Sequence, residues 1–158
     1  MTKRVFRNCS ILMLGLAAMQ MAASAQETPG VEGVWLANIT PVDCHTGAVI
    51  GNAVPFLGLY MFGHDGSLTN EAAFLISNPL RSSGLGTWQH TQAHTYTSTF
   101  RFFRYNPDGS FLSRRDVSFT IQLNGDKYTS TDRFQDFDAN NRPLPAMGCN
   151  IETATRLQ

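Results

Sequence analysis

Hydrophobic and polar positions beyond residue 25 alternate in short stretches that are separated by turn residues. Alternation with a period of two is typical of β-strands with one buried face, and no stretch sustains the 3.6-residue period of an amphipathic helix. The stretches are rich in β-branched and aromatic residues, and Gly- and Asn-containing turns recur between them. We therefore predict an all-β domain whose strands cover eight stretches: 33–42, 54–62, 67–75, 85–90, 94–105, 110–123, 126–137 and 146–156.

The sixth and seventh predicted strands, which flank Asn124-Gly125, divide most clearly into two faces. An Asn-Gly pair between alternating stretches is typical of a two-residue type I′ turn, with positive φ at both residues. That turn pairs Leu123 with Asp126 and places Val117 opposite Asp132. The apolar faces of the two strands then coincide, and we expect the following to point inward: Phe111, Ser113, Arg115, Val117, Phe119, Ile121 and Leu123, facing Tyr128, Ser130, Asp132 and Phe134.

The fifth predicted strand changes its pattern part-way along. Tyr96 and Phe100 suit an inward face near its start, whereas Phe103 and Tyr105 suit one near its end. We interpret this change as a β-bulge within residues 101–104.

Eight short antiparallel strands with short connections are what a small up-and-down β-barrel needs to leave no free edge. Such a barrel brings its last strand back beside its first. We therefore predict a small, closed, eight-stranded antiparallel up-and-down β-barrel.

The N-terminus has the features of a secretory signal peptide. Basic residues precede a short apolar stretch, Ile11 to Ala18, which is too short to span a membrane. Ala23-Ser24-Ala25 offers small residues for cleavage before Gln26. We expect residues 1–25 to be a signal peptide, residues 26–158 to be a single β-barrel domain, and the mature protein to be exported, either periplasmic or secreted.

The mature chain would retain two of the three cysteines, Cys44 and Cys149. An even number of cysteines in an oxidising compartment favours a disulfide, and barrel closure would bring these two together. The alternative is two separate buried thiols.

The chain resembles the lipocalin-like (calycin) β-barrels in a few residues. Gly33-Val34-Trp35, at the start of the first predicted strand, matches their Gly-x-Trp element, and Arg156 could be the basic residue that packs across that Trp. The resemblance implies a barrel with a ligand cavity. No C-terminal helix is predicted, so it implies a shorter relative of the lipocalins.

Arg115 and Asp132 are the candidate polar groups of the interior, because both lie on predicted inward faces and a buried charge needs a partner. The pair could orient a ligand, act as an acid or base, or be a structural ion pair. Inward tyrosines could donate hydroxyl groups or simply be core aromatics. The candidate ligand-binding residues are Tyr60, Tyr96, Phe100, Arg115, Val117, Phe119, Tyr128, Asp132 and Phe134.

These features favour an exported barrel that binds a small, mostly apolar or amphipathic molecule in its interior. One alternative is a cyclase or isomerase that uses the same cavity. Another is an exported interaction protein, such as a protease inhibitor, that acts through its loops.

Several other classes of protein are disfavoured. Three of the 12 basic residues lie in the predicted signal and none of the 12 acidic residues do, so the mature chain has a net charge of −3 and no basic surface for nucleic acid. No metal or cofactor motif is present in the sequence. An outer-membrane barrel would turn Arg115 and Asp132 toward lipid, so we expect the mature protein not to span a membrane.

Overall fold

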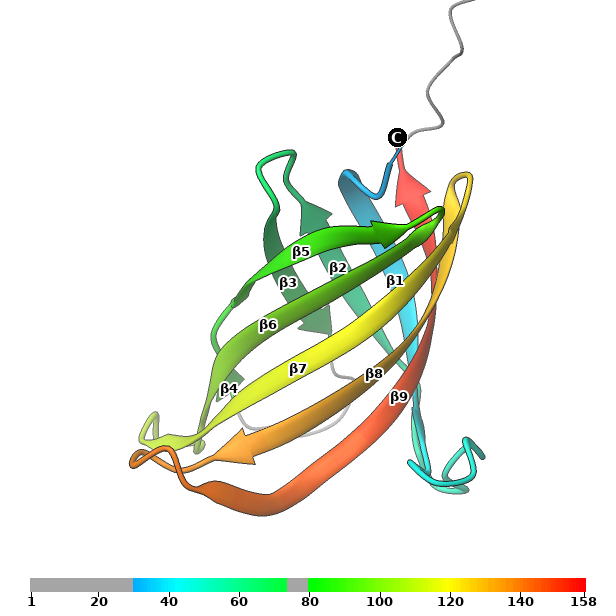
Figure 1. The fold of residues 1–158 in the computed structure, drawn as a ribbon. Coiled ribbons are helices and arrows are strands. Elements are labelled where there is room, and N and C mark those ends of the chain that lie inside the picture. Colours follow the sequence, from blue (N-terminus) through cyan, green and yellow to red (C-terminus); the bar gives the residue numbers. More distant parts are fainter. Residues whose placement is uncertain (1–29, 74–79) are drawn as a thin grey trace, which may run out of the picture.

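The computed structural model describes residues 30–73 and 80–158, and all regular secondary structure within them is β-strand (Figure 1). The predicted signal peptide, residues 1–25, lies outside the described residues and stays a prediction. The strands are β1 (Gly33–Val42), β2 (Phe56–Phe62), β3 (Ser67–Ala73), β4 (Leu80–Arg81), β5 (Gly84–Gln92), β6 (Thr95–Tyr105), β7 (Phe111–Asn124), β8 (Lys127–Phe137) and β9 (Pro143–Leu157).

Eight of these strands form a closed antiparallel barrel, as predicted. Each pairs with its neighbour in sequence, apart from the short β4, and β9 returns to pair with β1. The two-residue β4 pairs with the end of β6, so it lies on the same edge of β6 that β5 occupies further along. No helical segment capable of crossing a bilayer occurs in residues 30–73 and 80–158.

The predicted strand boundaries agree with the observed ones to within three residues where both are described. The predicted end of the third strand at Leu75 lies outside the described residues. The last strand begins at Pro143 rather than Ala146, because 143–145 pair in part with the end of β8 after a register shift.

The β7–β8 hairpin turn was wrongly predicted. Leu123 pairs with Tyr128 and Asn124 with Lys127, so the turn consists of Gly125-Asp126. Gly125 has φ +58°, whereas neither Asn124 nor Asp126 has positive φ. Glycine with positive φ at only the first of two central positions is the pattern of a type II′ turn. The register therefore shifts by two residues, which moves every pair along the strand but leaves the paired side chains from Ser113 onward on their predicted faces. Phe111, predicted to point inward, is instead 41% exposed and packs against the exposed Phe103, because the register of β6 and β7 shifts between Phe111 and Ser113.

The pattern of β6 was also misread. Tyr96, Ser98, Phe100 and Phe102 are all buried, while Phe103 is 48% exposed. The inward face therefore continues unbroken to Phe102, and the irregularity occurs later, between Arg104 and Tyr105.

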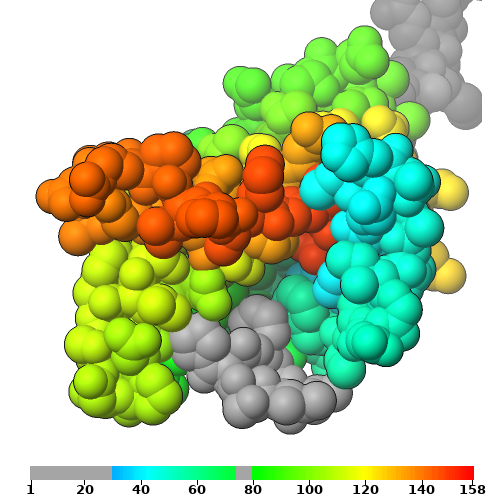
Figure 2. Space-filling view, turned by 90° about the horizontal axis from the view of Figure 1, so that it is seen from below, coloured from blue at the N-terminus to red at the C-terminus, as the bar shows by residue number. Residues whose placement is uncertain are grey.

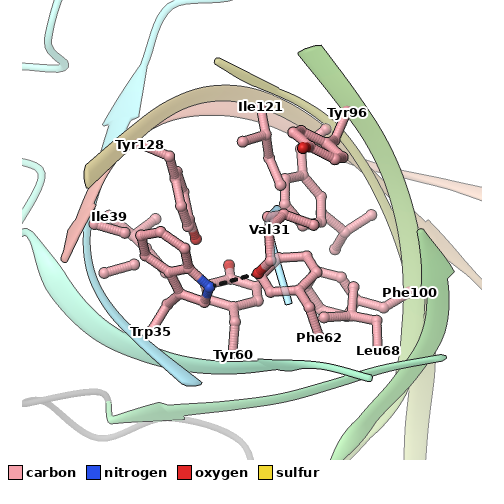
Figure 3. Packing of buried hydrophobic residues seen from close by; sticks show 14 of the residues in the cluster. Val31, Trp35, Ile39, Tyr60, Phe62, Leu68, Tyr96, Phe100, Ile121 and Tyr128 are labelled. Carbon is pink, nitrogen blue, oxygen red and sulfur yellow. Dashed lines mark hydrogen bonds between the residues drawn. The ribbon is translucent and has the colours of Figure 1, made fainter. Parts of the chain in front are cut away.

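One half of the barrel interior is filled by aromatic side chains (Figure 3). We call this the aromatic end; it is the end that carries the β2–β3, β5–β6 and β7–β8 turns (Figure 1). Rings from different strands meet at centroid distances of 5.0 to 6.5 Å in tilted and edge-on arrangements, which aromatic pairs prefer. The packed rings are those of Trp35, Tyr60, Phe62, Trp88, Tyr96, Phe100, Phe119 and Tyr128.

The segment before β1 covers the aromatic end. Val31 is fully buried, and its carbonyl accepts a hydrogen bond of 2.7 Å from Nε1 of Trp35. The guanidinium of Arg156 lies 4.2 Å from the centre of the Trp35 ring and donates hydrogen bonds to the carbonyls of Gly30 and Glu32. The predicted packing of Arg156 across Trp35 is thus confirmed, and it ties the last strand to the segment that precedes the first.

The predicted disulfide between Cys44 and Cys149 is present, with the two Cα atoms 5.2 Å apart. Cys44 follows β1, whose last residue, Val42, pairs with Cys149 on β9. The bond thus joins residues 105 positions apart where the barrel closes. A disulfide indicates a non-reducing compartment.

Candidate functional site

The barrel interior contains a small cavity at the end opposite the aromatic cluster. We call this the polar end; it carries the β1–β2 loop and the β6–β7 and β8–β9 turns, which surround a depression in the view from below (Figure 2). The cavity has a volume of about 40 Å³. It is lined by Ile39, Phe56, Tyr60, Asn70, Ala72, Arg81, Phe100, Phe102, Arg115, Val117, Asp132, Phe134, Asn150 and Glu152.

Six of the nine sequence-predicted site residues line this cavity: Tyr60, Phe100, Arg115, Val117, Asp132 and Phe134. The other three point inward as expected but do not reach it. Tyr96, Tyr128 and Phe119 pack in the aromatic cluster instead. The single large cavity expected from the sequence is therefore smaller and confined to the polar end.

Arg115 does not pair with Asp132, contrary to the sequence-based expectation. Its Nε and Nη2 atoms donate to the two carboxylate oxygens of Asp136, at 2.6 and 3.1 Å, in a bidentate arrangement. Its guanidinium also lies 3.8 Å from the centre of the Phe134 ring. Arg104 donates to the same Asp136 carboxylate, which is 1% exposed, so one buried anion serves two guanidinium groups.

Asp132 is held by an amide rather than by a cation. Nδ2 of Asn150 donates to its Oδ2 at 2.8 Å, across the β8–β9 pair. Its other oxygen, Oδ1, is buried without a hydrogen-bond partner among the described residues. Burial raises the pKa of Asp132 above its usual value of 3.8, and the hydrogen bond from Asn150 opposes that shift.

Glu152, on β9, is a second buried carboxyl group in the same cavity, with 2% exposure. The Tyr60 hydroxyl donates to its Oε1 at 2.6 Å, and the Ser130 hydroxyl donates to its Oε2 at 3.0 Å. Burial and the neighbouring Asp132 charge raise the pKa of Glu152 from 4.5 to about 8. At neutral pH the cavity therefore holds one mostly protonated carboxyl, that of Glu152, beside a second buried carboxyl whose pKa is also raised.

Arg81, in the short strand β4, completes the ring of polar groups. Its Nη2 donates to Oδ1 of Asn70 at 3.0 Å and to the Asn70 carbonyl at 3.2 Å, while Nε donates to the Ser82 carbonyl. Its guanidinium lies 3.8 Å from the centre of the Phe102 ring. Burial lowers the pKa of Arg81 from 12.5 to about 10, so the side chain keeps its charge at neutral pH.

Sequence reasoning missed most of these polar groups. Asp136 could have been found, because it continues the inward series of Ser130, Asp132 and Phe134 on the same strand. Asn150 and Glu152 have the same alternation on β9, where no face had been assigned. Asn70 and Arg81 could not have been placed from pattern alone, because nothing in the two-residue β4 indicates which way it faces.

The cavity has apolar walls, and its polar groups can both accept and donate hydrogen bonds. Asp132 Oδ1 offers an acceptor, and the guanidinium groups of Arg81 and Arg115 offer donors. Within residues 30–73 and 80–158 no cluster of three or more His, Cys, Asp or Glu side chains could hold a metal ion.

Neither a protein-family model nor a curated relative matches this chain. The structure shows a closed β-barrel, which is compatible with the lipocalin-like barrels named above. A shared fold does not show membership of that family.

Proposed function

We propose that this protein is an exported barrel that binds a small amphipathic molecule at its polar end. The polar head of the ligand enters the cavity and hydrogen-bonds to its polar groups, and its apolar part lies against the phenylalanines of the cavity wall. The observation that carries the proposal is Asp132 Oδ1, a buried acceptor without a partner among the described residues that belongs to a residue lining the cavity.

The gradient of burial in the cavity supports entry from the polar end. Tyr60, Asp132 and Glu152 are 2 to 5% exposed, whereas Phe56, Arg81 and Phe134 are only half-buried. A volume of about 40 Å³ has room for about three water molecules, so only a small head group fits inside. The rest of the ligand must lie toward the opening. This reasoning refines the expected ligand from mostly apolar to amphipathic.

The location of the site can be tested with two neighbouring alanines at the end of β3. Ala72 lines the cavity, whereas Ala73 is exposed. Ala72→Leu should fill the cavity, and Ala73→Leu adds the same side chain on the outside. Octan-1-ol is a suitable probe, because it combines one hydroxyl donor with an apolar chain, and its binding can be followed by calorimetry and by amide chemical shifts.

We expect octan-1-ol to bind the wild-type protein and the Ala73→Leu variant with equal affinity, and Ala72→Leu to lose at least tenfold in affinity. Thermal melts of both variants check that each remains folded, because overpacking can cost about 1–3 kcal/mol. Equal binding by a folded Ala72→Leu variant would place the ligand elsewhere and refute the proposal.

A second candidate function is acid–base catalysis in the same cavity, as in an isomerase or cyclase. The observation that favours it is the pair of carboxyl groups, Asp132 and Glu152, that line one cavity and whose pKa values are both raised by burial. An enzyme of this kind should exchange the hydrogens next to a carbonyl group for deuterium. Proton NMR of cyclopentanone in D₂O would detect exchange by the wild-type protein and its loss in Asp132→Asn; no exchange above the buffer rate would reject this candidate.

A further inference from the structure

Several guanidinium groups lie inside the polar end of the barrel. Arg81, Arg104 and Arg115 gather there, and both Arg104 and Arg115 bind the single carboxylate of Asp136. Among the described residues, Arg81 has no carboxylate within ion-pair distance; the exposed Glu71 favours its charged form only through a longer-range field. With Glu152 protonated, these three guanidinium groups stand against the two carboxylates of Asp132 and Asp136, so the interior around the cavity carries one uncompensated positive charge.

Two of these guanidinium groups also have donors left over. An arginine has five N–H donors. The described partners of Arg81 use only Nε and Nη2, and those of Arg115 use the same two nitrogens. The Nη1 groups of both side chains have no acceptor among the described residues. Both side chains line the cavity.

The packing fixes these side chains where they stand. Arg81 lies flat on Phe102 and Arg115 on Phe134, each at 3.8 Å, and hydrogen bonds hold the other edge of each guanidinium. The two groups also lie close enough for their charges to repel, since Arg115 disfavours the charged form of Arg81. Holding two like charges together at a cavity has a cost that an anion between them would offset.

We propose that the amphipathic ligand carries a carboxylate, which binds between Arg81 and Arg115 at the entrance of the cavity. This inference rests on the proposed function, and it adds the chemical class of the ligand: an organic acid with an apolar chain. A neutral or cationic amphiphile of the same size would leave the excess charge uncompensated, so it should bind more weakly.

Three probes with the same chain separate the possibilities: octanoate, octan-1-ol and octylamine, titrated at pH 7 into the full-length mature protein by calorimetry. We expect octanoate to bind at least tenfold more tightly than octan-1-ol, and octylamine to bind most weakly, because charge-assisted bonds to arginine exceed neutral ones in strength.

A pair of variants assigns the selectivity to Arg81. Arg81→Gln removes the unpaired charge, and Arg133→Gln removes an equal charge from an exposed position on β8. We expect Arg81→Gln to lower the affinity for octanoate at least tenfold more than the affinity for octan-1-ol, and thermal melts report whether the variant remains folded. Arg133→Gln should leave both affinities unchanged.

The outcomes distinguish the inference from the function on which it rests. Equal binding of octanoate and octan-1-ol by the wild-type protein overturns the carboxylate proposal but leaves the binding function standing. Equal losses of octanoate affinity in the two variants would mean that only net charge matters, which also overturns it. Failure of all three probes to bind refutes the proposed function itself.

Discussion

The protonation of Glu152 makes a prediction about how stability depends on pH. Replacing Glu152 by Gln keeps the shape of the side chain but leaves it neutral at every pH. The amide oxygen can still accept the hydrogen bond of the Tyr60 hydroxyl, and the Ser130 hydroxyl can rotate to accept from the amide nitrogen. The substitution therefore removes the ionisation while preserving the local contacts.

The magnitude follows from the shift in the pKa of Glu152. That pKa is about 8 in the folded protein and 4.5 in the unfolded chain, so between these pH values the folded state retains a proton that the unfolded state releases. The stabilisation is thus fully present below pH 4.5 and is lost as pH rises through 8. The pKa values differ by about 3.5, and each unit corresponds to about 1.4 kcal/mol, which gives about 5 kcal/mol in total.

Urea unfolding of the oxidised protein between pH 5 and pH 9 provides the assay. The free energy of unfolding of Glu152→Gln, relative to the wild-type protein, should rise by several kcal/mol across this range. Glu71→Gln, at an exposed position on β3, is the matched control and should show no such trend. A constant difference between Glu152→Gln and wild type from pH 5 to pH 9 would refute the assignment of a raised pKa to Glu152.

Two further predictions concern the closure and the turns of the barrel. Replacing both Cys44 and Cys149 by Ser should lower the unfolding free energy by about 4–5 kcal/mol in urea titrations, because the disulfide closes a loop of 105 residues; no change would mean that the bond does not constrain the unfolded chain. Gly125→Val should lower the melting temperature through about 1–3 kcal/mol of backbone strain, since φ is +58° there, whereas Thr129→Val on the outer face of β8 should not.

The sequence predicts the faces of the strands better than their registers. Alternation identifies the inward side of β7 and β8 because an apolar run such as Val117, Phe119 and Ile121 can be buried on only one side. The position of the turn is less determined, since Asn124-Gly125 and Gly125-Asp126 are both plausible hairpin turns. The choice between them moves the register by two residues, to which the pattern of faces is insensitive.

This insensitivity explains why the candidate site was only half predicted. Arg115 and Asp132 were correctly placed inside, but their pairing depended on the register. In the observed register Arg115 lies opposite Asp136, which binds it, and Asp132 lies opposite Phe119. Asn150, the partner of Asp132, lies on a different strand, so this contact also depends on the register of β8 and β9. The loop between these two strands does not fix that register from the sequence.

The distribution of polar groups inside the barrel argues against a purely structural role for them. Inward positions near the aromatic end are almost entirely apolar, while those near the polar end include Asn70, Arg81, Arg115, Asp136 and Glu152. Buried ion pairs can often be replaced by apolar side chains without loss of stability, so folding alone does not require them. Residues that do not fit the pattern stabilising a fold, such as polar residues at inward positions, concentrate at functional sites. Because the charged groups occur where the cavity lies, whereas the ring-packed end buries only uncharged polar groups such as those of Ser98 and Tyr128, ligand binding explains their position better than stability does.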